Sequence, residues 1–165
     1  MTDSAVAEPQ LLTLPEARAH CADGAAPPLA VLVGWVETYL MSAHADLGRS
    51  GAVCPFTRQA AKLDTVRLGI STATAADAEA AFAAVSRSFA ELDAIPAPPA
   101  MQHFRTVIIG FPGCADPAGT TMLQRVQKRL KFASLRRFRM IGLMHPDSEA
   151  PGLWNPQFRP LRTPF

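Results

Sequence analysis

The stretch FRTVIIGF, residues 104–111, decides the fold, because it is almost continuously apolar and rich in β-branched side chains. A run of this length and composition is typical of a strand that is buried on both faces. We therefore expect it to be the central strand of a sheet.

Two further strands are expected beside it. In KLDTVRLGI, residues 62–70, apolar side chains alternate with polar or small ones from Val66 onward. This two-residue period is typical of a strand with one covered face. The second expected strand is FRMIGLM, residues 138–144, an apolar run that ends directly before His145.

Helical patterns separate the expected strands. Apolar residues recur at three- and four-residue steps from Leu29 to Leu47, from Thr74 to Leu92 and from Thr120 to Phe132. Such steps place the apolar side chains on one face of a helix. Asp116 and Pro117 precede the last pattern, where Asp suits the N-cap and Pro suits the first turn.

The order helix, strand, helix, strand, helix, strand predicts an α/β or α+β domain with one small sheet of about three or more strands. The strand directions stay open. A chain of 165 residues suits one domain, which we expect at residues 28–165 after a flexible N-terminal arm at residues 1–27. The proline-rich tail keeps Trp154, Phe158 and Phe165, so we expect it to wrap the sheet or to precede further strands.

Composition and charge limit the classes of function. Apolar residues make up 48% of the chain and charged residues 18%, which is ordinary for a globular protein. The net charge of +2 is too small to indicate nucleic-acid binding, and no run approaches the roughly 20 apolar residues of a membrane span. We expect a cytoplasmic protein with a small-molecule substrate, no nucleic-acid or membrane partner, and three reduced cysteines.

His145 is the first candidate for chemistry. It follows the third expected strand, at the end where open α/β sheets place ligands and catalytic groups. Pro146 restricts its backbone, and imidazole is a common metal ligand and general base. The structural alternative is a strand-end histidine that is hydrogen-bonded to a neighbouring loop.

Two cysteines are further candidates. Cys54 stands in CPFTR with Arg58 four residues later, and a neighbouring cation lowers a thiol pKa. It is a possible nucleophile with His145 as base, or a small buried side chain. Cys114 precedes a helix N-terminus that could hold an anion, although Asp116 explains that loop without a ligand. The direction of the first strand decides which thiol His145 can meet.

A basic cluster, KRLKFASLRRFR, occupies residues 128–139. Its pattern favours a solvent-exposed helix face. Two functional alternatives are a nucleic-acid stripe and salt-bridge donors to the carboxylates of a cofactor or substrate. The stripe is disfavoured, because the cluster holds only two phenylalanines and the rest of the chain offers no basic complement.

Three segments carry a resemblance: GAVCPFTRQA at residues 51–60, FRTVIIGFPG at residues 104–113, and MIGLMHPDSEAPGLWNPQFRPLRTPF at residues 140–165. Together they resemble a family of uncharacterised bacterial domains associated with natural-product biosynthesis. The Cys-Pro-Phe loop and the Gly-Leu-x-His-Pro-x-Ser stretch are more distantly similar to heme-dependent N-hydroxylases, which oxidise guanidine nitrogens of arginine-like substrates. The resemblance also implies a C-terminally incomplete domain.

The resemblance implies a heme site with His145 as the axial iron ligand and the Cys54 to Arg58 loop as part of the pocket wall. We add Arg139, from the basic cluster, as a cofactor-binding residue. The implied function is a heme-binding domain that acts as an oxygenase or N-hydroxylase on an amino-acid-like substrate. The alternative is a non-catalytic accessory or small-molecule-binding module of a biosynthetic pathway.

Overall fold

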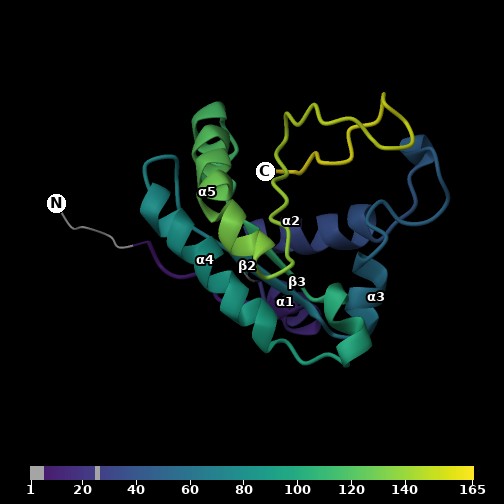
Figure 1. The fold of residues 1–165 in the computed structure, drawn as a ribbon, viewed down its shortest axis with the longest axis horizontal. Helices are drawn as coiled ribbons and strands as arrows, with labels where there is room; N and C mark the ends of the chain where they lie inside the picture. The colour runs from purple at the N-terminus through teal and green to yellow at the C-terminus, as the bar shows by residue number, and fades with distance from the viewer. Residues whose placement is uncertain (1–5, 25–26) are drawn as a thin grey trace.

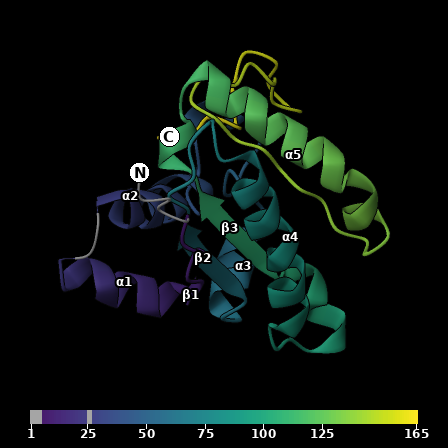
Figure 2. The same cartoon turned by 90° about the vertical axis from the view of Figure 1, so that its left-hand side faces the viewer.

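The computed structural model describes residues 6–24 and 27–165 and has a mixed α/β architecture. Its three-stranded sheet has the order β1-β2-β3, where β1 is Leu12–Thr13, β2 is Val66–Ile70 and β3 is Thr106–Gly110. Helices cover both faces (Figure 1). Figure 2 shows α1 and α2 on one side of the strands, and α4 and α5 on the other. The predicted fold class is confirmed.

The N-terminal segment takes part in the packed fold, where the sequence predicted a flexible arm. Strand β1 pairs antiparallel with β2 and leads directly into α1, Leu14–Ala22. Thr13 and Glu16 form a capping box at the start of this helix. Leu14 is only 3% exposed and belongs to the first core cluster, because α1 packs on α2 and β2. Residues 1–5 and 25–26 of the expected arm lie outside the described residues.

The helix predicted from Leu29 to Leu47 is shorter in the structure. The α-helix α2 spans Pro27–Trp35 and continues as a single π-helical segment, Val36–Leu40. A short 3-10 turn, Ala45–Leu47, follows after a break. The buried side of α2 and the π segment covers the sheet through Leu32, Val36 and Leu40. The six-residue helix α3, Thr57–Lys62, lies between this region and β2 and was not predicted.

The central strand is β2, and the prediction that residues 104–111 form the centre of the sheet is wrong. Strand β3 pairs with β2 in parallel and has no partner strand on its other side among the described residues. Val66 and Leu68 in β2 are 1% and 0% exposed, whereas Thr106 to Ile109 in β3 are half-buried. The run of β3 is apolar because helices α2 and α4 pack on its two faces. An edge strand can be buried on both faces in this way, as a central strand is.

Two long helices complete the second layer. Helix α4, Ala78–Ala94, contacts β3, and helix α5, Pro117–Leu135, packs along α4. As predicted, Asp116 is the N-cap of α5 and accepts a hydrogen bond from the backbone N–H of Gly119 at 2.6 Å, with Pro117 in the first turn. Short 3-10 turns, Pro99–Phe104 and Pro112–Cys114, flank β3.

The segment predicted as a third strand, residues 138–144, forms no strand. Phe138 belongs to the turn that ends α5, and residues 139–144 have no regular secondary structure. The segment contacts both halves of the core, because Ile141 packs against the α4–α5 cluster and Met144 packs against the α1–α2 cluster. Gln127 of α5 donates a side-chain hydrogen bond to the Ile141 carbonyl oxygen at 2.7 Å. This backbone position is therefore held by a helix, and the apolar pattern results from contact with both clusters.

The C-terminal segment wraps over the domain, as the tail aromatics indicated. Phe158 is 8% exposed, and the ring of Phe165 lies so close to Gly110 at the end of β3 that a Cβ atom there would be 2.6 Å from it. Trp154, in contrast, is 66% exposed. Within the described chain, no helix is long and apolar enough to cross a membrane.

Candidate functional site

An open pocket of about 550 Å³ lies between the α2–π-helix region and the C-terminal segment. Its lining comes from two parts of the chain that are more than one hundred residues apart, so it exists only because the tail folds back over α2. The lining residues are Trp35, Tyr39, Asp46, Asn155, Gln157, Phe158, Arg159, Arg162, Thr163 and Pro164.

Aromatic rings form one wall of this pocket. Trp35 and Tyr39 stack with their centroids 6.1 Å apart, because residues four positions apart face the same side of a helix. His44 lies edge-on to Tyr39 and packs on Phe158 with a centroid distance of 4.6 Å. The row joins α2 to the tail, and Trp35, Tyr39 and Phe158 contribute aromatic surface to the pocket.

Three polar contacts fix the shape of this wall. The Tyr39 hydroxyl donates to the Pro160 carbonyl oxygen at 3.2 Å, and burial raises the pKa of Tyr39. Asn155 donates from its side chain to the Asp46 carbonyl oxygen at 2.8 Å. His44 Nδ1 accepts from the backbone N–H of Asp46, so its neutral ring carries the proton on Nε2.

Two arginines of the C-terminal segment are the cationic part of the lining. Arg159 donates from Nε to one carboxylate oxygen of Glu149 at 3.0 Å, and Arg162 donates to the other oxygen. Arg162 also donates from Nε to the Ser148 carbonyl oxygen. Hydrogen bonds from Arg159 and then Arg162 lower the pKa of Glu149. The shared carboxylate orients both guanidinium groups at the rim of one pocket.

His145 lies close to these arginines but does not line the pocket. Its backbone N–H donates to the Leu161 carbonyl oxygen at 3.2 Å, directly before Arg162, and its carbonyl accepts from Ser148. The side chain is half-buried and makes no hydrogen bond to another described residue. Its ring nitrogens therefore have no hydrogen-bond partner among the described residues, and the residue follows no strand.

The structure brings Cys54 and Arg58 together but leaves Arg139 apart. The backbone N–H of Cys54 donates to the Leu40 carbonyl oxygen, and Arg58 donates from Nε to the neighbouring Met41 carbonyl oxygen. Both therefore brace the end of the π-helical segment. Arg139 faces α4, where its guanidinium lies 3.8 Å from the carboxylate of Asp93.

The thiols show no catalytic arrangement. Cys114 is 2% exposed, its Sγ donates to the Ala73 carbonyl oxygen at 3.3 Å, and burial raises the pKa of this thiol. Cys54 packs against the first core cluster, and no described hydrogen bond links it to His145. Because β2 and β3 are parallel, Cys114 follows the carboxyl end of β3 and Cys54 lies toward the opposite edge.

The residues predicted for a heme site do not surround one space. Cys54 and Met144 share the α1–α2 cluster, which places His145 on the same side as the Cys54 loop. Arg139 is engaged on the α4 side, and neither described pocket is lined by any of the four predicted residues. Within residues 6–24 and 27–165, no cluster of three or more His, Cys, Asp or Glu side chains could hold a metal ion.

A second pocket of about 470 Å³ lies between α4 and α5 and is lined mainly by small and apolar side chains. Arg129 covers part of it. Its guanidinium stacks over the ring of Phe82 at 4.0 Å and pairs with the carboxylate of Glu79 at 2.5 Å. This guanidinium already holds an acidic and an aromatic partner of the protein, which favours a structural role for it.

A known family matches this chain. Residues 29–165 match the model described as Domain of unknown function (DUF6875). The chain belongs to this family. The matched residues include most of α2, all of the pocket lining and the C-terminal segment. No curated protein and no solved structure gave a significant match.

Sequence reasoning missed the pocket lining. Trp35 and Tyr39 were hidden in a helical pattern, and Arg159 and Arg162 stand in a proline-rich tail without periodicity. The only signal was the presence of aromatics in that tail, which indicated packing but not a partner. The path of the tail decides which rings and arginines line the same pocket. Sequence patterns over a few residues do not predict such a path.

Proposed function

We propose that this domain is a small-molecule-binding module whose ligand is flat, largely apolar and anionic. The observation that carries the proposal is the lining of the 550 Å³ pocket, where the stacked rings of Trp35 and Tyr39 border the same space as Arg159 and Arg162. A volume of this size suits a drug-sized ligand. Stacked rings accept a planar body, and oriented guanidinium groups bind carboxylates.

Glu149 holds the two arginines in place. One carboxylate is shared by two guanidinium groups, and each guanidinium has five N–H donors. Donors therefore remain for a ligand, and the side chains are held in place before it arrives. Such preorganisation lowers the entropic cost of binding.

Heme is one member of this ligand class, because it is planar and carries two carboxylates. The predicted heme-dependent oxidation of an amino-acid-like substrate remains a prediction, since its four residues do not assemble into one site. Of these four residues, His145 is the one predicted as the iron ligand, and its side chain is half-buried. Heme is therefore used below as a probe that can separate planar-anion binding from iron ligation.

The test compares ferric heme with metal-free protoporphyrin IX. We expect both to quench tryptophan fluorescence, because Trp35 lines the pocket. Arg162→Gln should weaken both interactions about tenfold, as expected for loss of a charged hydrogen bond. Arg87→Gln is the matched control, because Arg87 is an exposed arginine paired with Glu8 outside the pocket.

The outcomes distinguish binding of a planar anion in the pocket from iron ligation by His145. Binding of both porphyrins that depends on Arg162 and not on His145 supports the proposal. Binding of heme alone, with a Soret shift that is lost in His145→Ala, favours iron ligation by His145. Absence of binding, or equal binding in Arg162→Gln and wild type, refutes the pocket as the site of a planar anion.

A further inference from the structure

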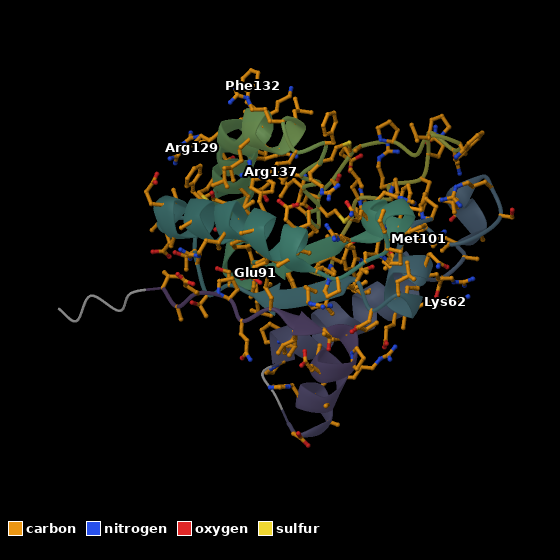
Figure 3. The ribbon with its side chains drawn as sticks, turned by 60° about the horizontal axis from the view of Figure 1, so that its bottom comes forward. Lys62, Glu91, Met101, Arg129, Phe132 and Arg137 are labelled. Atoms are coloured by element: carbon orange, nitrogen blue, oxygen red, sulfur yellow. The ribbon has the colours of Figure 1, made fainter. Side chains whose placement is uncertain are left out.

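The end of α5 exposes an unusual number of apolar side chains. Phe132, Leu135, Phe138 and Met140 are 78%, 52%, 93% and 89% exposed. They stand within nine residues of the chain, and Figure 3 shows Phe132 pointing away from the body of the molecule. We call these four residues, together with Lys128, Lys131 and Arg136, the α5 tip.

The exposure follows from the geometry of the helix. Met122, Val126 and Leu130 form the inner face of α5 and are 3–5% exposed. Phe132 and Leu135 stand on the outward face, about half a turn away from that stripe, and cannot reach the core. These apolar side chains do not serve the packing of this domain.

The backbone at Phe138 adds an independent observation. Arg139 N–H donates to the Ser134 carbonyl oxygen, and Phe138 N–H donates to that of Leu135, which is the Schellman pattern of a helix end. Phe138 occupies the left-handed position of this motif, with φ of +52°, where glycine is preferred. The strained turn projects the most exposed aromatic ring of the chain outward.

The charges around these side chains are of one sign. Between Pro117 and Met140 there are seven Lys and Arg residues and no Asp or Glu. Arg129 pairs with Glu79, while Arg137 and Arg139 approach Asp93. Four cations make no ion pair within the described residues, and all four are exposed: Arg125, Lys128, Lys131 and Arg136.

We propose that the α5 tip docks on an anionic lipid surface. Protruding apolar side chains suit insertion at the level of the head groups, and the surrounding cations complement acidic lipids. A protein groove would have to enclose side chains that project from a convex helix end, whereas a bilayer surface accommodates them without such a shape. This contact needs no membrane span. It departs from the expectation that the protein has no membrane partner, which was based on the lack of a sufficiently long apolar run.

The experiment is sedimentation of the full chain with vesicles. We expect binding to phosphatidylglycerol-containing vesicles, weak binding to pure phosphatidylcholine, and loss of binding at high salt. Each cation near an anionic surface strengthens binding about fivefold. Lys128→Glu should therefore reduce binding at least about fivefold, and Lys62→Glu, at the end of α3, is the charge-matched control (Figure 3).

A second pair of variants tests the apolar component without loss of the fold. Phe138→Asn removes the ring and keeps a residue that tolerates the left-handed backbone. Leu153→Ser is its control, because Leu153 is 96% exposed at a different place. We expect weaker vesicle binding for Phe138→Asn at an unchanged or higher melting temperature, and wild-type binding for Leu153→Ser.

Three outcomes overturn the proposal. The first is an absence of binding to anionic vesicles. The second is equal binding by wild type and the α5-tip variants. The third is binding to a different partner in place of vesicles, seen as concentration-dependent dimerisation or as retention of RNA. If either is lost in Phe138→Asn or Lys128→Glu, the α5 tip binds a second copy or a nucleic acid.

Discussion

Replacing Phe138 by glycine should stabilise the protein, although it removes a large apolar side chain. The side chain is 93% exposed, so little buried area is lost. The backbone, in contrast, has φ of +52°, a conformation that costs a non-glycine residue about 1–2 kcal/mol. Glycine avoids this cost, but its greater freedom in the unfolded chain returns about 0.5–1 kcal/mol.

The expected net effect of Phe138→Gly is a gain of about 0.5–1 kcal/mol in the free energy of unfolding. For a chain of this length that gain raises the melting temperature by about 1–4 °C. Urea denaturation followed by circular dichroism measures the free energy, and calorimetry measures the melting temperature.

The matched control is Phe132→Gly, which changes the same residue type six positions earlier. Phe132 is also exposed, at 78%, but lies inside α5. Glycine there should cost up to about 1 kcal/mol, because it weakens a helix interior. Destabilisation by both substitutions would refute the reasoning, since it would show that the left-handed turn is not formed in solution or that the Phe138 ring is packed.

Two other expectations concern the sheet and the pocket wall. Leu68→Ala should cost about 3 kcal/mol in urea denaturation, because this side chain is fully buried in the central strand; Ile109→Ala, in the edge strand, should cost clearly less, and equal losses would contradict the strand order. Glu149 has a lowered pKa in the folded state, so its contacts stabilise the protein above pH 4.5 and weaken as the pH falls below it. The difference in melting temperature between wild type and Glu149→Gln should accordingly shrink on acidification, and a constant difference would refute this linkage.

Helix α5 is an element whose main features can be predicted from local sequence patterns. The sequence predicts its apolar period, its N-cap at Asp116 and the place of Pro117 in its first turn. The structure confirms all three. These features depend on residues within four positions of one another, which is the range of helical hydrogen bonds and side-chain neighbours. For the same reason the strands at 66–70 and 106–110 were found close to their observed bounds.

The errors in the strand assignments have one origin. An apolar run indicates that a segment is buried, but it does not indicate which element the segment packs against. Residues 104–111 and 138–144 are both apolar, yet the first contains an edge strand and the second has no strand and contacts two clusters. The strand that completes the sheet, β1, has two residues, too few for any periodicity. A short strand of this kind is identified only by the ladder that it joins.

The sequence by itself determined the α/β class, the long helices and two of the three strands, because their signals are local and repeat along the chain. Tertiary structure alone decided the strand order and the place of the N-terminal segment. It also decided the meeting of Trp35 and Tyr39 with Arg159 and Arg162. That meeting joins segments more than one hundred residues apart, and its geometry is set by the packing of the tail against α2, for which no local interaction substitutes.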